Sequence, residues 1–386
     1  MQAGLGTSVR GRVDEAVGEA AHEARRGLGG RVPDVALVVA TAAWGESALR
    51  ALVVAVADQL GSAAIVGGSV DGILVGEEWA IHRPGLAVLG LTDVQYSVSH
   101  SEDLSGDEGR AAHELAIGHP SAADPGDTMI LFADSLGVAP RPILRGLATA
   151  VPGLPIVGIG TSEPMGASPL VWAGAHAASA ACAALTIRSK TSPPSIGVTH
   201  ACRRVGPVHR VTRARGHWVL GLDGEPALDV LRAAEGVVLP GRNPLVGLLA
   251  DAGPDPDRKD AMTVRNVVGF DEARRGFAIP EPVRSGARLV ALAPDVDPIR
   301  FDGDLAAVRA SGASSPGPAP LWGLYLTCRA AGAGLLSPVL PGGAVSAAMA
   351  GAPLLAMSAA YQIAPSAISR RGPELHTHSA IAVLFR

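Results

Sequence analysis

A pattern of buried strand, helix and second strand occurs three times in the 386 residues, and it constrains the fold more than any other feature. The copies begin with the apolar runs 34–40, 128–134 and 321–328. From Val39 to Gly67 the offset is 28 residues, and the equivalent offsets in the later copies are 26 and 30. The copies are too degenerate for a solenoid and indicate an internal duplication. Helices are expected from Leu49 to Leu60 and over 141–151 and 343–351, and the second strands are expected at 63–69, 154–163 and 353–362.

This alternation predicts an α/β protein. We expect two layered α/β halves that meet near residue 230, with mixed β-sheets, helices outside and internal strand-helix-strand pseudo-repeats. Apolar residues at helical spacing predict a further helix over 12–26.

Small residues end the second strand of each copy, and we expect ligand-binding turns there, at 67–72, 158–163 and 356–362. The first turn does not match a nucleotide-phosphate loop, because Ile73 and Leu74 stand where Lys and Ser or Thr are needed. Small residues leave room and free N–H donors for a small molecule, although Gly, Ser and Asp also form ordinary turns. The candidate ligand contacts are Gly67, Gly68, Ser69 and Asp71 in the first turn, and Thr161, Ser162 and Glu163 in the second.

Composition narrows the function classes. The formal charge of -4 and the absence of a long basic block argue against a nucleic-acid partner. The first residues lack the apolar core of a secretory signal, and no run of about 18 apolar residues is present, so we expect a cytoplasmic protein without membrane contact. Three widely spaced cysteines do not form a disulfide framework. No motif indicates a cofactor, and the oligomeric state is not indicated.

Several motifs, spread in order along the chain, carry a resemblance to a known family. The segment 206–231 contains the motifs Val-Thr-Arg and Leu-Asp-Gly-x-Pro-Ala-Leu and resembles the end of the N-terminal domain of FIST-domain proteins. The segment 64–79 is similar to the GGSxxG turn of the same domain. The segments 243–250, 263–292, 324–329 and 351–366 resemble the FIST C-terminal domain in order.

The resemblance implies an N-terminal helical extension at 1–30, a FIST N-terminal domain at 31–228 and a FIST C-terminal domain at 229–386. It also implies an intracellular sensory module that binds a small ligand such as an amino acid or another small carboxylate. The sequence shows no output domain, so we expect any signal to pass through a separate protein partner or through a change of oligomeric state.

The last turn departs from the family, which usually reads Gly-Glu-Ile where this chain has Tyr361, Gln362 and Ile363. The change replaces a carboxylate by an amide and leaves Tyr361 and Gln362 as candidate pocket residues. Arg329 is the most plausible fixed cation for an anionic ligand group, beside Cys328 as a passive wall. Arg265 lies among β-branched residues, where an arginine either reaches out at a sheet edge or pairs with a carboxylate, and it is also a pocket candidate.

Other classes of function stay open. An enzyme would use Cys328 as the nucleophile, activated by Arg329 and one of His376 or His378, with turn N–H groups as an oxyanion hole. No Gly-x-Ser-x-Gly elbow or zinc-protease helix supports a named reaction. His376 and His378 also have the spacing of some metal pairs, on one face of a strand. A third possibility is a protein-interaction scaffold.

Overall fold

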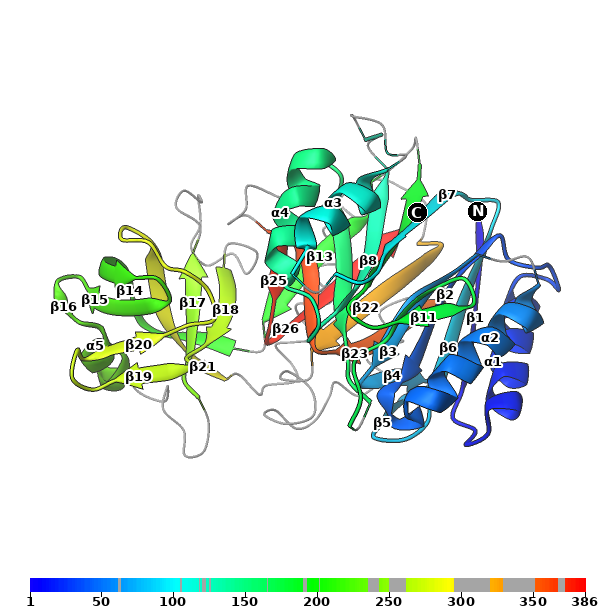
Figure 1. Cartoon of the computed structure of the whole chain (residues 1–386), viewed down its shortest axis with the longest axis horizontal. Coiled ribbons are helices and arrows are strands. Elements are labelled where there is room, and N and C mark those ends of the chain that lie inside the picture. Colours follow the sequence, from blue (N-terminus) through cyan, green and yellow to red (C-terminus); the bar gives the residue numbers. More distant parts are fainter. Residues whose placement is uncertain are drawn as a thin grey trace.

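The computed structural model describes most of the chain. The described residues are 1–61, 64–104, 106–117, 119, 123–124, 126–164, 166–189, 193–200, 202–234, 243–249, 262–294, 320–328, 351–366 and 372–386. Helices alternate with strands, and sheets contain both parallel and antiparallel pairs, so the predicted α/β class is confirmed. Figure 1 shows a large body of three sheets with a smaller, mainly β body beside it that also contains the short helix α5 (Ala227–Ala233).

The first repeat covers residues 2–92 and is built around the predicted strand-helix-strand unit. Strands β2 and β3 are parallel, and Val39 pairs with Gly68. Strand β6 lies between β1 and β2 and runs antiparallel to both. The elements of this repeat are β1 (Gln2–Ser8), α1 (Val13–Gly27), β2 (Val35–Thr41), α2 (Glu46–Leu60), β3 (Ala64–Val70), β4 (Gly72–Val75), β5 (Glu78–Ile81) and β6 (Leu86–Thr92).

The second repeat has the same order of elements. The parallel pair is β8 and β9, with Phe132 opposite Ile159, and β12 runs antiparallel to β8 and β7. Its elements are β7 (Gln95–Ser101), α3 (Glu108–Ala116), β8 (Thr128–Asp134), α4 (Pro140–Ala150), β9 (Ile156–Thr161), β10 (Val171–Ala173), β11 (His176–Ala178) and β12 (Cys182–Arg188).

The third repeat completes the set, with Leu326 of one parallel strand opposite Met357 of the other. Its expected helix at 343–351 lies outside the described residues except for position 351. The strands are β13 (Ser195–His200), β22 (Trp322–Cys328), β23 (Leu354–Ala359), β24 (Tyr361–Pro365), β25 (Pro373–His376) and β26 (Ser379–Phe385). The predicted internal duplication is therefore confirmed in the strand pairing.

The three repeats exchange hairpins in a cycle. Each repeat contributes four strands to one sheet, and the sheet is extended by the hairpin of another repeat. Hairpin β4–β5 of the first repeat joins β23 of the third, β10–β11 of the second joins β3 of the first, and β24–β25 of the third joins β9 of the second. The two halves of the sequence thus share sheets, and the expected boundary near residue 230 falls inside helix α5 (Ala227–Ala233).

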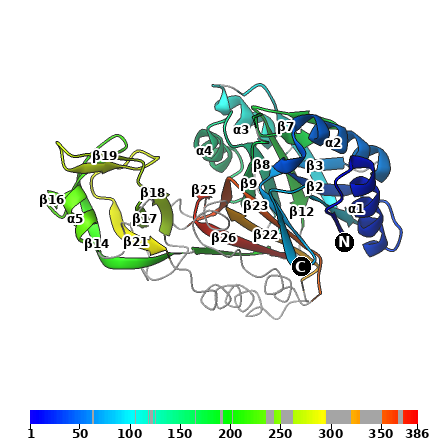
Figure 2. The same cartoon turned by 90° about the horizontal axis from the view of Figure 1, so that it is seen from below.

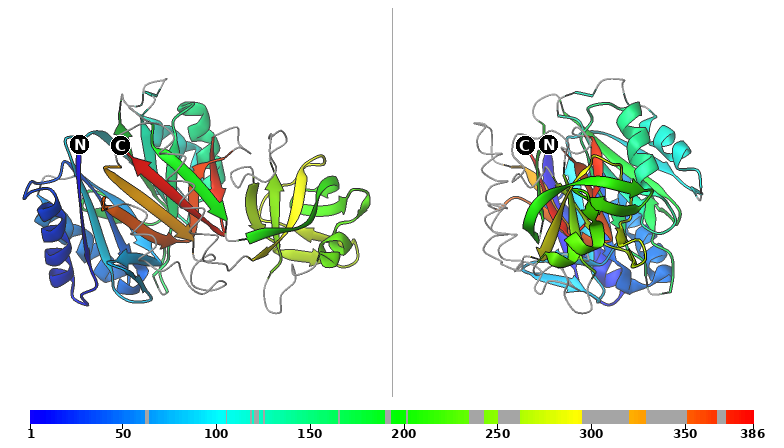
Figure 3. Two further views of the ribbon diagram at one scale, coloured as in Figure 1. Left: turned by 180° about the vertical axis from the view of Figure 1, so that it is seen from behind. Right: turned by 90° about the vertical axis from the view of Figure 1, so that its left-hand side faces the viewer.

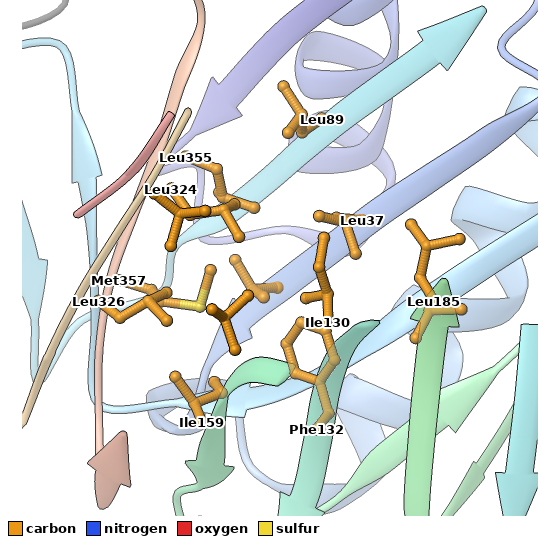
Figure 4. Packing of buried hydrophobic residues seen from close by; sticks show 14 of the residues in the cluster. Leu37, Leu89, Ile130, Phe132, Ile159, Leu185, Leu324, Leu326, Leu355 and Met357 are labelled. Carbon is orange, nitrogen blue, oxygen red and sulfur yellow. The ribbon is translucent and has the colours of Figure 1, made fainter. Parts of the chain in front are cut away.

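The three sheets enclose one common core. Leu37 and Leu89 come from the first sheet, Phe132 and Leu185 from the second, and Leu326 from the third, all at most 1% exposed. Figure 4 shows these side chains pointing toward one another from different strands. Strands β2 and β8 are buried on both faces, by this core and by the outer helices, and their sequences are therefore nearly continuous apolar runs.

Helices cover the outer faces of two sheets. Helix α1 buries a stripe of small residues and α2 a stripe of leucine and valine against the first sheet, as their spacing predicts. Helices α3 and α4 cover the second sheet in the same way. Figure 1 shows both helix pairs outside the sheets. No helix among the described residues has the length and apolarity needed to cross a bilayer.

A β domain, defined as residues 202–294, is inserted between β13 and β22. Its long strand β14 pairs with both β15 and β21, so one continuous path of strands runs through the domain. Figure 2 shows β14 at the junction with the three-sheet body, and Figure 3 shows the domain from behind and end-on. Its strands are β14 (Cys202–Arg215), β15 (Trp218–Leu222), β16 (Glu225–Pro226), β17 (Leu245–Leu249), β18 (Met262–Asn266), β19 (Gly269–Asp271), β20 (Gly276–Ala278) and β21 (Arg288–Pro294).

Candidate functional site

The three predicted turns are places where a strand passes from one sheet to the next. Gly67, Gly68 and Ser69 do not form a turn but lie within β3, where they are buried. The correction has a local reason, since Gly67 and Gly68 pair with Trp172 and Val171 of β10, a strand from the next repeat. The chain bends only at Asp71, between β3 and β4.

The three segments meet, as the repeat pattern predicts. A cycle of main-chain hydrogen bonds joins them: Asp71 N–H donates to Ser358 O at 2.8 Å, and Ser162 N–H donates to Ser69 O at 2.8 Å. Ala360 N–H closes the cycle by donating to Gly160 O at 3.1 Å. The N–H groups that we expected to face a ligand thus bind carbonyls of the neighbouring repeat.

Side chains from neighbouring repeats fill the space beside the glycines. A Cβ added at Gly68 would lie 2.3 Å from Thr161 Cγ2, and one at Gly160 would lie 2.2 Å from the Tyr361 ring. The Ser69 hydroxyl donates to Ser162 O at 2.6 Å. Close approach of strands therefore accounts for the glycines at this junction. Whether Gly67, Gly68, Ser69, Asp71, Thr161, Ser162 or Glu163 contacts a ligand stays a prediction.

Tyr361 and Gln362 are both buried in β24. Burial raises the pKa of the Tyr361 phenol well above its usual value, and Cys182 and Asp134 nearby raise it further. The Gln362 amide oxygen accepts a 2.7 Å hydrogen bond from the Ser379 hydroxyl. Both side chains pack within the protein where the resemblance expected pocket residues.

Cys328 ends β22 and is fully buried. Its sulfur accepts a 3.1 Å hydrogen bond from the main-chain N–H of His378, whereas the His378 ring lies with Nε2 2.9 Å from Asn266 Oδ1. The contact between Cys328 and His378 thus runs through the main chain. Arg329, the expected cation beside Cys328, lies outside the described residues.

His376 and His378 do not share one strand face, which corrects the prediction. His376 ends β25, and His378 lies in the connection to β26 with a positive φ of 52°. The His376 ring stacks on His200 with centroids 6.0 Å apart, and burial, His200 and Arg265 hold the pKa of His376 far below its usual value. Burial lowers the pKa of His378 to about 4. In the described part of the chain, no group of three or more His, Cys, Asp or Glu side chains is placed to hold a metal.

Arg265, the remaining pocket candidate, lies where the β domain meets strand β25. It lies on β18, the edge strand of the β domain that faces β25, and its side chain is 2% exposed. Its guanidinium lies 3.1 Å from Glu281 of the β domain and 3.3 Å from Glu374 of β25. Of the two alternatives for this arginine, the structure shows pairing with carboxylates.

Arg141 of helix α4 contacts the same two carboxylates, Glu281 directly and Glu374 at 3.5 Å. The result is a charge ring of two arginines and two glutamates, with Arg141 and Glu374 on the three-sheet body and Arg265 and Glu281 on the β domain. Burial lowers the pKa of Arg265, with Arg141 adding to the effect, and the two glutamates oppose it. We call these four residues the charge ring.

The charge ring borders a cavity of about 550 Å³ between helix α4, strand β25 and the β domain. This volume falls within the usual range for small-ligand pockets, roughly 300–1,000 Å³. Apolar walls come from residues such as Leu144 and Leu248. The charged lining consists of Arg141, Arg145, Glu281, Arg284, Arg288 and Glu374.

Arg145 makes this lining unusual. It lies four residues after Arg141 on α4, so the two guanidinium groups share one helix face, a like-charge arrangement that destabilises a helix. Arg141 is compensated by the charge ring, but no described carboxylate lies within ion-pair distance of Arg145. An anion in the cavity would supply the missing partner.

Of these residues, only Arg265 was predicted from the sequence as a pocket candidate. Arg141, Glu281 and Glu374 come from segments far apart in the chain, so no local spacing connects them. One signal was available: the Arg-x-x-x-Arg spacing of 141 and 145 in an otherwise apolar amphipathic helix places two cations on one face.

Comparisons with known proteins support part of the predicted resemblance. A model of the FIST N domain matches residues 34–225, which covers most of the first two repeats and the start of the β domain. A FIST C domain was not detected, so that part of the resemblance stays a prediction. Two uncharacterized proteins, from two strains of Mycobacterium tuberculosis, are 26% identical to the chain over 100% of both lengths. The FIST domain is in general a sensory domain for small ligands.

Proposed function

We propose that the protein is a sensory module that binds a small carboxylate, such as an amino acid, in the cavity between helix α4 and the β domain. The single observation that carries the location is Arg145, a cation that lines the cavity without a described carboxylate partner. The FIST N match supports the class of function.

The lining suits a zwitterion. A ligand carboxylate would pair with the guanidinium of Arg145 and with the exposed side of Arg141, because two arginines offer directional, charge-assisted hydrogen bonds. Glu281 and Glu374 would accept hydrogen bonds from a ligand ammonium group. Part of the binding free energy comes from contact between the ligand and the apolar walls, and the charged groups fix the orientation of the ligand.

The cavity also suits signalling. Its walls belong to two bodies, so a ligand that binds both walls favours one relative arrangement of them. We propose that the protein acts in the cytoplasm and that a protein partner reads this arrangement. We also propose that residues 229–386 correspond to the FIST C domain.

Calorimetric titration with a panel of amino acids and small carboxylates tests the proposal. The best ligand should bind Arg145→Met at least about tenfold more weakly than the unchanged protein, which is the loss of roughly one charge-assisted contact. The matched control is Arg232→Met, which also removes an arginine from a helix, but one paired with exposed Glu272 in the β domain. If Arg145→Met and the unchanged protein bind the ligand with equal affinity, the ligand does not bind beside Arg145 and the proposed location in this cavity is wrong.

A further inference from the structure

We infer that Glu374 is the specificity-determining residue of the cavity, and that it selects a ligand with an ammonium group through one oxygen of its carboxylate, Oε2. This inference rests on the proposed function, because it concerns the same cavity and a ligand whose carboxylate lies beside Arg145. The proposed function gives the ammonium contact to Glu281 and Glu374 alike. The contacts within the charge ring assign it to Glu374.

The contacts of Glu374 all fall on its other oxygen, Oε1. This atom accepts hydrogen bonds from Arg265 Nη2 at 3.3 Å and from the main-chain N–H of Leu375 at 3.1 Å. Arg141 Nη1 lies 3.5 Å from the same atom. The three donors come from the β domain, strand β25 and helix α4, so together they fix the orientation of the carboxylate. Among the described residues, no hydrogen bond or ion pair reaches Oε2.

The Oε2 atom of Glu374 can accept a hydrogen bond from a ligand. Glu374 lines the cavity, and 17% of its side chain is exposed. Each oxygen of an ionised carboxylate accepts about two hydrogen bonds, and it accepts them best from a charged donor. An ammonium group offers three N–H donors and a positive charge, whereas a hydroxyl group offers one neutral donor. The free oxygen therefore favours an ammonium group in this position.

Glu281 differs from Glu374 because arginines contact both of its oxygens. Oε1 lies 3.1 Å from Arg265 Nε, and Oε2 contacts Arg141 directly. The exposed fraction of the Glu281 side chain is 8%, about half that of Glu374. The carboxylate of Glu281 thus holds the two arginines together, and we assign it a structural role in the charge ring.

Arg141 borders the positions of both charged groups of the ligand. Its Nη1 contacts the two glutamates, while its Nε and Nη2 make no ion pair with the described residues, and 31% of its side chain is exposed. Arg145 lies one turn further along the same face of α4. A ligand carboxylate can therefore bind the free edge of Arg141 together with Arg145. Glu374 lies on the other side of the Arg141 guanidinium, so the cavity can hold an anionic and a cationic group close together.

The test compares amino acids with their hydroxy analogues, which keep the carboxylate and nearly the same shape but replace the ammonium group by a neutral hydroxyl group. The probe pairs are alanine with lactate, valine with α-hydroxyisovalerate, and glutamate with α-hydroxyglutarate. In calorimetric titration of the unchanged protein at neutral pH, we expect the amino acid of at least one pair to bind about tenfold more tightly than its hydroxy analogue. This ratio corresponds to one charge-assisted hydrogen bond in place of a neutral one.

Two variants of matched charge make the comparison specific to Glu374. Glu374→Gln and Glu281→Gln each remove one carboxylate from the charge ring and leave the other beside Arg141 and Arg265. Glu374→Gln should reduce the preference for the amino acid to less than about threefold. Glu281→Gln should change the affinities of both members of a pair by the same factor, so the preference stays near tenfold.

Thermal unfolding of each variant checks that the fold is retained. If Glu374→Gln does not fold, Glu374→Asp takes its place: it keeps the charge but withdraws the carboxylate by one methylene group, and it should also reduce the preference. Arg232→Met, which breaks an exposed ion pair with Glu272, should bind both members of each pair as the unchanged protein does.

Arg145→Met separates this inference from the proposed function. It removes a contact to the carboxylate that both members of a pair carry, so it should weaken both about tenfold and preserve their ratio. Equal binding of both members of every pair, or an equal loss of preference in Glu374→Gln and Glu281→Gln, overturns the role of Glu374. If Arg145→Met still loses affinity in that case, the proposed function stands alone. If no probe binds the unchanged protein, both proposals fail.

Discussion

Arg265 of the β domain lies 3.3 Å from Glu374 of strand β25, and this ion pair joins the β domain to the three-sheet body. The arginine is almost fully buried, whereas Glu374 also lines the cavity. The ion pair at the interface between the two bodies therefore includes a residue, Glu374, that also lines the proposed ligand site.

Removing the buried member of this pair should cost much stability. In Arg265→Met, Glu281 and Glu374 lose this buried cation and, among the described ion pairs, keep the one with Arg141; breaking a buried pair from one side typically costs about 3–5 kcal/mol. The free energy of unfolding in urea measures the loss. Arg232→Met, which breaks the exposed pair with Glu272, should lose less than about 1 kcal/mol. Similar losses in both variants would contradict the structural role of the charge ring.

The repeat junction should not tolerate a methyl group at Gly160. In Gly160→Ala the new Cβ meets the buried Tyr361 ring at 2.2 Å, and such overpacking typically costs about 1–3 kcal/mol. The cost should shrink when the substitution is made in Tyr361→Ala, as a double-mutant cycle in urea would show. Gly18→Ala is the control: nothing lies within 4 Å of its added Cβ in helix α1, so it should stabilise by about 0.5–1 kcal/mol. No coupling between positions 160 and 361 would refute this packing.

Acid should destabilise the protein through His378. Its pKa is lowered from 6.5 to about 4 by burial, so the unfolded chain binds a proton between these values that the folded protein does not. Stability from this residue is complete above pH 6.5 and falls as the pH drops toward 4, by about 3 kcal/mol in total.

The measurement is the free energy of unfolding between pH 7 and pH 4 in His378→Gln and in the unchanged protein. The variant should show a smaller fall, while exposed His113→Gln on helix α3 should follow the unchanged protein. Parallel curves for His378→Gln and the unchanged protein would contradict the assigned pKa.

The three cysteines should react slowly in the folded state. Cys182, Cys202 and Cys328 are all buried, and burial raises the pKa of Cys182 to about 12. A thiol reagent with mass-spectrometric readout should label them only after unfolding in urea. Rapid labelling of Cys328 in the folded protein would instead favour the nucleophilic enzyme considered from the sequence.

The sequence was sufficient to predict the repeated units, because each buried strand and each amphipathic helix carries its own local period. Val39, Phe132 and Leu326 occupy equivalent positions in the three parallel pairs. The hairpin exchange was not predicted. Strand β4 finds its partner Met357 almost 300 residues later, and local pattern carries no information about such a partner.

The site was predicted only in part for a similar reason. Arg265 was noticed because a charge interrupts an apolar strand, and that signal is local. Its partners Glu281 and Glu374 each follow a proline outside any periodic apolar run, so no local pattern marks them, and the docking of the β domain on β25 brings them together. The glycines of β3 were interpreted as a turn because close strand packing and tight turns select the same residue.

Because each exchanged hairpin pairs with a strand of another repeat, the order in which the strands are synthesised affects how the chain folds. Strand β3 emerges long before β10 covers its edge, and β4–β5 must wait for β23, which is among the last strands made. A nascent chain therefore presents unpaired strand edges until its C-terminal region arrives, and contacts of this range slow folding. A chain that stops before Leu354 should not yield a stable shorter protein: it lacks β23, β24, β25 and β26, which complete two of the three sheets, and its open edges favour aggregation.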